Sequence, residues 1–113
     1  MADFREIKDP NEVKPYFNIW CDQHGSNFSG DDGQLWGYLI TGSSWILPTG
    51  TLYKNSDNTN AVTIAGIVYA SGTVATIWLS SGTSGVNYTL TNRIGTSDGR
   101  TLDWSIIVPV SDL

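Results

Sequence analysis

The chain has 113 residues, which suits a single domain built around one core. Its net charge is −5 with only six Lys and Arg, so it lacks the basic stripe of a nucleic-acid-binding protein and would not be drawn to an anionic membrane. Cys21 is the only cysteine, which excludes an intramolecular disulfide, and no apolar stretch resembles a signal peptide or a membrane span. We therefore expect a protein made in a cytoplasm and used there or in a particle assembled there.

Residues 1–15 differ from the rest of the chain, because they hold most of the lysines, several acids and two prolines. This composition predicts an extended N-terminal arm that precedes a single domain over residues 16–113. The arm has too few apolar residues to fold alone, and such segments are disordered unless something ties them down. We expect the tie to be another chain, with Phe4 and Ile7 as the anchors of the contact.

The rest of the chain is predicted to alternate between short strands and turns rich in Gly, Ser, Asn and Asp. Residues 22–34 are predicted to form a loop, and residues 55–60 a polar turn. The run 61–70 would be apolar on both faces of a strand, so we expect one long strand that is covered on both sides of a sheet. The predicted strands are residues 16–21, 35–41, 44–47, 51–53, 61–70, 73–80, 86–94 and 100–108.

About seven or eight short strands at this spacing favour an antiparallel β-sandwich, with a small barrel as the second choice. The clearest alternation lies in residues 86–94, where Val86, Tyr88, Leu90 and Ile94 share one face. We predict that this face packs in the core.

Each of the five tryptophans is more compatible with core packing than with a sugar-binding platform. Trp104 shares a face with Leu102 and Ile106 and is predicted to lie in the core. Trp78 lies on the opposite face of its strand from Ile77, so it is predicted to point outward. Trp78 is therefore the best candidate for an aromatic residue that contacts a partner.

The sequence offers little for catalysis or metal binding. His24 is the only histidine and lies in a predicted loop, which argues against a catalytic triad, and one His with one Cys cannot complete a zinc site. Asp31, Asp32 and Asp57 could place oxygen ligands for calcium in loops, but Asp in polar turns usually bonds the local backbone, and we favour that interpretation. We expect no enzyme activity, no cofactor and no metal.

Four motifs carry a resemblance to a known family. They read Ser-Trp-Ile-Leu-Pro-Thr-Gly from Ser44, Trp-Leu-Ser-Ser-Gly-Thr-Ser-Gly from Trp78, Tyr-Thr-Leu-Thr-Asn-Arg-Ile from Tyr88, and Thr-Ser-Asp-Gly-Arg-Thr from Thr96. In this order they resemble small proteins found among the virion genes of tailed bacteriophages, whose second motif is usually Trp-Leu-Ser-Gly-Gly-Thr-x-Gly. The chain departs from that pattern at Ser81, where the family often has Gly.

The resemblance implies an immunoglobulin-like β-sandwich located in a phage virion. Our first expectation is a head decoration or cement protein that binds the major capsid protein as a symmetric homo-oligomer. A subunit that binds only the assembled shell would stabilise that shell by mass action. A neck or head–tail joining component, with neck proteins as partners, is the alternative, and a carbohydrate-binding adhesion module is the third hypothesis.

Overall fold

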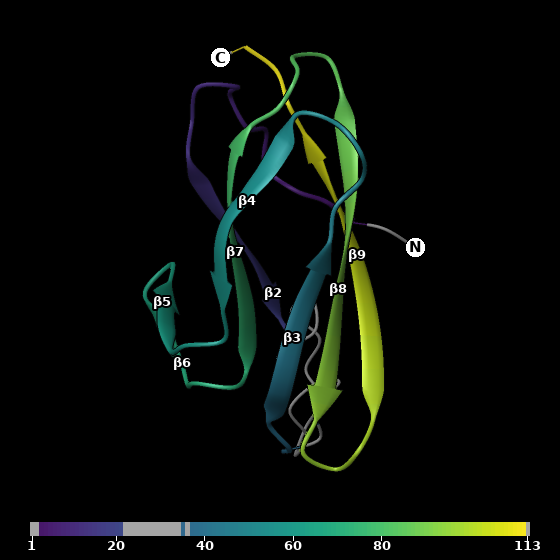
Figure 1. Cartoon of the computed structure of the whole chain (residues 1–113). Coiled ribbons are helices and arrows are strands. Elements are labelled where there is room, and N and C mark those ends of the chain that lie inside the picture. The colour runs from purple at the N-terminus through teal and green to yellow at the C-terminus, as the bar shows by residue number, and fades with distance from the viewer. Residues whose placement is uncertain (1–2, 22–34, 36, 113) are drawn as a thin grey trace.

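The computed structural model of the protein describes residues 3–21, 35 and 37–112. These residues form nine β-strands and no α-helix (Figure 1). The chain is thus all-β, as predicted. The strands are β1 (Asp3–Phe4), β2 (Lys14–Ile19), β3 (Ile40–Ile46), β4 (Leu52–Asn58), β5 (Val62–Ile64), β6 (Ile67–Tyr69), β7 (Val74–Ser81), β8 (Asn87–Thr96) and β9 (Thr101–Pro109).

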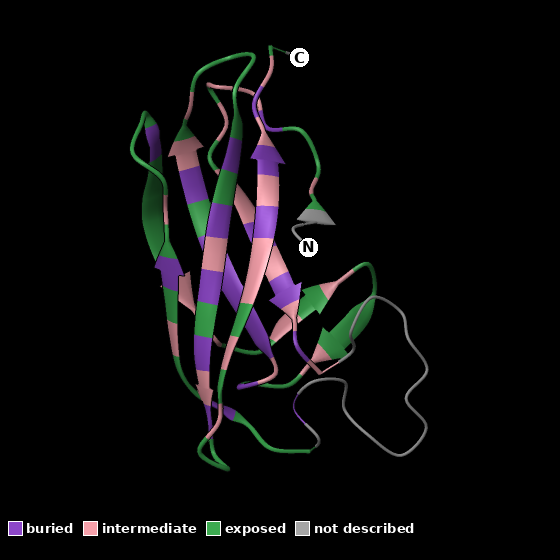
Figure 2. Cartoon of the chain, turned by 90° about the vertical axis from the view of Figure 1, so that its right-hand side faces the viewer, coloured by how far each residue is buried: buried purple, intermediate pink, exposed green. Residues whose placement is uncertain are grey.

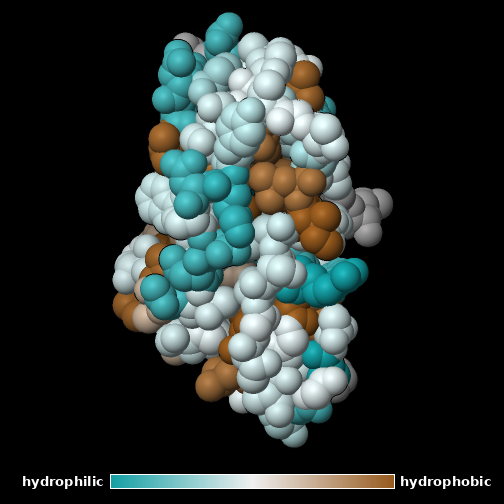
Figure 3. Space-filling model, in the orientation of Figure 1, coloured by the Kyte–Doolittle hydropathy of each residue, from teal (hydrophilic) through white to brown (hydrophobic). Residues whose placement is uncertain are grey.

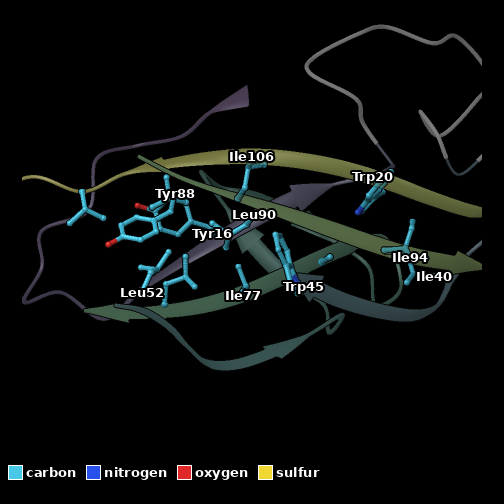
Figure 4. Close-up of a cluster of buried hydrophobic side chains, with 14 of the residues drawn as sticks. Tyr16, Trp20, Ile40, Trp45, Leu52, Ile77, Tyr88, Leu90, Ile94 and Ile106 are labelled. Atoms are coloured by element: carbon cyan, nitrogen blue, oxygen red, sulfur yellow. The ribbon is translucent and has the colours of Figure 1, made fainter. Parts of the chain in front are cut away.

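Two sheets face each other and enclose the core. One has four strands in the order β1-β9-β8-β3, and the other has three in the order β2-β7-β4. Paired strands are antiparallel except β1 and β9, and strands β5 and β6 form a separate hairpin beside the three-stranded sheet (Figure 1). Figure 4 shows the core side chains between the sheets, with Leu52 and Tyr88 towards one end and Ile40 and Ile94 towards the other. The expected all-β sandwich is confirmed.

The long strands alternate between buried and more exposed residues (Figure 2). In β8, Tyr88, Leu90 and Ile94 are buried, which confirms the face that the sequence predicts. Val86, just before the strand, is the exception, because its side chain is exposed. The same face also buries Asn92, a polar residue that the apolar pattern does not single out.

One strand replaces the two that we expected at residues 35–41 and 44–47. Strand β3 pairs antiparallel with β8, and its register shifts between Ile40 and Gly42. The bulge lies at Thr41, and the Gly-Ser segment that suggested a break pairs regularly with β8. Leu35, expected in a strand, lies outside the sheets and is fully buried in the core.

The polar run at residues 55–60 was predicted to be a turn, and that prediction was wrong. Strand β4 continues through Asn58 and pairs with β7, with a register shift between Lys54 and Ser56. Because β4 is an edge of the three-stranded sheet, its polar side chains can face solvent. Polar residues thus mark an edge strand here rather than a turn.

The apolar run at residues 61–70 is not a single covered strand. It folds back at Ala65 and Gly66, whose φ angles are +52° and +82°. Two consecutive residues with positive φ form the tight turn typical of a two-residue hairpin, and Gly66 accepts that conformation without strain. Ile67 and Val68 are 56% and 75% exposed, so the prediction of a well-covered strand was wrong.

The N-terminal segment is extended and lies along its own domain. Strand β1 pairs in parallel with β9, and the backbone N–H groups of Arg5 and Lys8 donate to the carbonyls of Ile107 and Pro109 at 2.8 and 2.9 Å. The chain then turns over residues 9–12 and enters β2 in the opposite sheet. The edge of β9 therefore holds this segment in place.

Lys8 is fully buried, which is rare for a lysine. Its Nζ donates to the backbone carbonyls of Ser81 and Asp9 at 2.6 and 2.9 Å. Burial lowers the pKa of the Lys8 ammonium, and the carboxylates of Glu12 and Asp9 oppose that shift. Ser81 has a φ of +63°, so Lys8 bonds a residue in the left-handed region at the end of β7. Lys8 thus ties the N-terminal segment to the three-stranded sheet.

A buried hydrogen-bond network joins the two sheets. Oδ1 of Asn92 in β8 accepts from Nε1 of Trp20 at 2.9 Å and from Nδ2 of Asn18 at 3.4 Å. Its Nδ2 donates to Oγ of Ser43 at 3.0 Å and to the carbonyl of Ser44 at 2.9 Å. Because both polar atoms of the Asn92 side chain are bonded, the carboxamide avoids the cost of an unsatisfied buried group.

The burial of β8 generates a stability prediction. Tyr88→Ala removes a core ring whose hydroxyl accepts the Thr83 backbone N–H at 2.9 Å, so the unfolding free energy should fall by about 3–5 kcal/mol. Thr89→Ala, on the exposed face, should lower it by about 0.5 kcal/mol or less. Urea unfolding of both variants measures the difference, and equal losses would show that the faces of β8 are misassigned.

The buried Lys8 generates a second stability prediction. Lys8→Met keeps an unbranched apolar stem but leaves the Ser81 carbonyl without its ammonium donor, so the unfolding free energy should fall by about 1–3 kcal/mol. Lys14→Met is the control, because Lys14 pairs with the exposed carboxylate of Glu6 and such pairs contribute about 0–1 kcal/mol. If chemical denaturation finds the Lys8 variant as stable as wild type, the tie to Ser81 contributes nothing to folding.

Candidate functional site

The outer face of the three-stranded sheet carries exposed aromatic residues. On β7, Ile77 and Leu79 point into the core and are fully buried, whereas Trp78 between them is 38% exposed. Trp78 lies opposite Pro15 of β2 and Ser56 of β4 in the two ladders. The sequence prediction that Trp78 points outward is therefore confirmed, and its role in a contact stays a prediction.

Other apolar side chains extend this surface on both sides of Trp78. Phe17, two residues after Pro15 on the same face of β2, is half-buried, and Tyr53 on β4 is 57% exposed. We call Pro15, Phe17, Tyr53 and Trp78 the aromatic face. An exposed cluster of this kind on a small domain is typical of a protein-contact surface.

The β5–β6 hairpin stands next to the aromatic face. Figures 1 and 2 show it beside the ends of β2 and β7. Ile64 and Tyr69 on its inner side are partly buried, whereas Val68 on its outer side is 75% exposed. In Figure 3 apolar surface is visible at the side of the molecule where the hairpin lies. The sequence analysis missed this surface, and the signal that could have found it is the Ala-Gly turn in the middle of the apolar run.

A groove of about 480 Å³ follows β2 between the hairpin and the N-terminal segment. This volume lies within the range of sites that bind ligands or peptide segments. One wall comes from the hairpin, and the other from the N-terminal segment and β9. The groove is lined by Arg5, Glu6, Lys14, Pro15, Tyr16, Phe17, Ile19, Ile64, Tyr69 and Trp104.

The polar groups of the groove are held by bonds within the domain. Nη2 of Arg5 donates to Oδ1 of Asn18 at 2.8 Å, and its guanidinium lies 5.3 Å from the centroid of the Trp104 ring, within the range of a cation–π contact. Lys14 and Glu6 form an ion pair at 2.8 Å at the rim. These contacts fix the wall on the side of the N-terminal segment.

Tyr16 lies beneath the same rim and donates its hydroxyl proton to the backbone carbonyl of Glu6 at 2.8 Å. Burial raises the pKa of this phenol, and the charges of Glu6 and Glu12 raise it further. Tyr16 therefore stays protonated in the physiological range and serves as a hydrogen-bond donor. The groove thus combines aromatic rings, apolar side chains and fixed polar groups, which suits binding of a polypeptide.

The sequence-predicted contact residues do not form one patch. Phe4 and Ile7 are 66% and 45% exposed on the segment that runs along β9, and Trp78 lies on the outer face of the other sheet. Partner contact at any of the three stays a prediction.

The residues considered for metal binding are not gathered into a site. Asp57 forms an ion pair with Lys54 at 3.3 Å, and His24, Asp31 and Asp32 lie outside the described residues. Within residues 3–21, 35 and 37–112, no cluster of three His, Cys, Asp or Glu could hold a metal ion. In the same part of the chain, no helix is long and apolar enough to cross a membrane.

No curated protein matches the sequence. The sequence does match the family described as podophage GP4 fiber-tail adaptor protein gp77, over residues 8–109. The match supports a structural component of a tailed-phage virion, as the resemblance implied, and gives no support to head decoration, whereas the neck or tail alternative fits better. Because the match covers both sheets and most of the chain, the protein belongs to the podophage GP4 fiber-tail adaptor gp77 family.

Proposed function

We propose that this protein is a structural joint that connects tail fibres to the tail of a podophage. The observation that carries the proposal is the family match over residues 8–109, which spans strands β2 to β9. The proposed partners are therefore a tail protein on one side and a fibre protein on the other. These two proteins replace the major capsid protein, which was the binding partner that we first expected.

The distribution of exposed apolar residues suits a joint. An adaptor must contact two different proteins at once, so it needs two separate surfaces on one rigid body. The aromatic face and the hairpin lie on the outside of the three-stranded sheet, whereas Phe4 and Ile7 lie at the β9 edge of the other sheet. Large apolar and aromatic side chains are the residues that usually anchor protein contacts.

The composition suits the same role. Charged residues make up 15% of the chain, which is below the usual quarter for soluble proteins. Charged side chains are depleted at the centres of protein interfaces, because desolvating them is costly. We propose that much of this surface is buried in the assembled virion, where copies of the chain are arranged around the tail axis as a homo-oligomer.

Deletion of the gene tests the proposal. Particles assembled without the protein should have filled heads and complete tails but no fibres in electron micrographs, and plasmid-borne protein should restore the fibres. Mass spectrometry of wild-type particles should count on the order of ten copies rather than hundreds, because a tail has few symmetry-related positions and a head has many. Hundreds of copies, or fibres that remain on deletion particles, would contradict the proposal.

The aromatic face gives a prediction at the level of one residue. Trp78→Ala should weaken binding to purified tail or fibre protein about tenfold or more and lower the unfolding free energy by only about 1 kcal/mol. Ile77→Ala, its buried neighbour, should lower the unfolding free energy by about 2–5 kcal/mol.

Tyr38→Ala is the matched control for binding, because Tyr38 is 46% exposed and does not belong to the aromatic face. Calorimetry or surface plasmon resonance measures the affinities. Equal affinities of wild type and the Trp78 variant for both partners would show that the aromatic face is not a contact surface.

A further inference from the structure

Residues 3–8 lie as a strap along one edge of the domain, and polar groups rather than apolar side chains hold the strap there. Phe4 and Ile7 are 66% and 45% exposed, so they bury little apolar surface. Among the strap side chains that the structure describes, only that of Lys8 is fully buried. The strap therefore lacks the apolar anchors that hold strands β7, β8 and β9 in the core.

Three backbone hydrogen bonds join the strap to the end of β9. The amide of Arg5 donates to the carbonyl of Ile107 at 2.8 Å. The amide of Lys8 donates to the carbonyl of Pro109 at 2.9 Å, and the carbonyl of Lys8 accepts from the amide of Ser111 at 3.0 Å. Because strand β1 spans two residues at the outer end of its sheet, water can replace these partners when the strap moves away.

Two further hydrogen bonds tie the strap to the three-stranded sheet. The hydroxyl of Tyr16 in β2 donates to the backbone carbonyl of Glu6 at 2.8 Å. The ammonium of Lys8 donates to the backbone carbonyl of Ser81 at 2.6 Å. Lys8 therefore takes part in both sets of bonds, through its backbone with the β9 end and through its side chain with the end of β7.

The buried ammonium opposes the closed position of the strap. Taking a charge out of water is unfavourable, and burial lowers the pKa of the Lys8 ammonium for this reason. The bonds that this group donates to the carbonyls of Ser81 and Asp9 offset part of the cost. The free energy gained by closing is therefore the difference between a few hydrogen bonds and the desolvation of one charge.

We infer that the strap opens from the β9 edge as a unit while both sheets stay folded, and that the bond between Lys8 and Ser81 is its latch. Segments with few buried apolar contacts open locally at free energies below that of global unfolding. Opening as a unit follows from the position of Lys8, because the strap cannot leave β9 around this residue without also pulling its side chain from Ser81. The inference concerns the fold of this chain and does not depend on the adaptor role.

Opening would change two surfaces of the domain at once. It would free the carbonyls of Ile107 and Pro109 at the sheet edge, and it would remove Arg5 and Glu6 from the lining of the groove. A free sheet edge can pair with other chains, so the closed strap withholds this part of the β9 edge from such pairing. The latch thereby controls both the edge and one wall of the groove.

Hydrogen–deuterium exchange of the full chain, resolved to single amides, tests the inference. The reference is the buried Leu90 in β8, which has the same parity as Thr96, whose amide donates across the β8–β9 ladder. After correction for intrinsic rates, the amides of Arg5, Lys8 and Ser111 should exchange within about threefold of one another. They should exchange about a hundredfold or more faster than Leu90, because they need only the strap to open.

Two exchange patterns would overturn the inference. Exchange of all three strap amides at the rate of Leu90 would show that the strap opens only when the whole domain unfolds. Fast exchange at Arg5 with slow exchange at Lys8 and Ser111 would show that the chain frays from its N-terminus rather than opening as a unit.

Two variants separate strap opening from unfolding. Ile94→Ala removes a buried side chain at the end of the core away from Leu52, which pairs with Ser81 of the latch (Figure 4). It should speed exchange at Leu90 about tenfold or more and leave the strap amides unchanged, because the contacts of Ile94 persist when the strap opens. Lys8→Met should speed exchange about tenfold at the strap amides and at Leu90, because the latch is lost in both processes.

The two variants can also contradict the inference. Equal acceleration of strap and reference amides in Ile94→Ala would show that the strap does not open by itself. Unchanged strap amides in Lys8→Met would show that Lys8 is not the latch. The wild-type exchange pattern decides between unit opening and fraying even if a variant fails to fold.

Discussion

The two sheets are held in register by one buried side chain. Asn92 in β8 accepts from Asn18 of β2 in the opposite sheet and from Trp20, which directly follows β2, and it donates to Ser43 and Ser44 of its own sheet. Apolar contacts between two sheets change little when one sheet slides over the other. Sliding would break the hydrogen bonds of the Asn92 carboxamide and leave buried polar groups unsatisfied, which costs free energy. This network fixes where β2 lies against the four-stranded sheet. It thereby fixes the groove, which has β2 as its floor.

A second tie closes the opposite end of the sandwich. The Lys8 ammonium bonds the carbonyl of Ser81, whose φ of +63° is unusual for a residue with a side chain. Gly would adopt this φ without strain, so the backbone at this position favours Gly. Gly82 follows with φ +101°, and a Cβ there would lie 2.9 Å from Val110. The β7–β8 turn is therefore set by backbone conformation as much as by packing.

The two free edges of the three-stranded sheet are built differently. The β4 edge carries Lys54 and Asp57 and a register shift, features by which proteins discourage pairing with other chains. The β2 edge carries Pro15, Phe17 and Ile19, which are partly buried, and has a groove along it. Among the described residues, the fold thus protects the β4 edge and places no strand against the β2 edge. In the proposed adaptor role, the aromatic face next to this edge would serve as a contact surface.

The sequence by itself determined the all-β class, the three C-terminal strands and the outward direction of Trp78, because period-two alternation reports local burial directly. The sequence also indicated the resemblance to tailed-phage virion proteins, through motifs whose glycines mark turns. Tertiary structure alone decided that residues 55–58 extend β4, that the hairpin within residues 61–70 is exposed, and that Lys8 is buried. In each case the residue type fits two environments, and only the neighbouring strand selects one. The groove has the same origin, since β2, the hairpin and β9 are distant in sequence and meet only when the sheets pack.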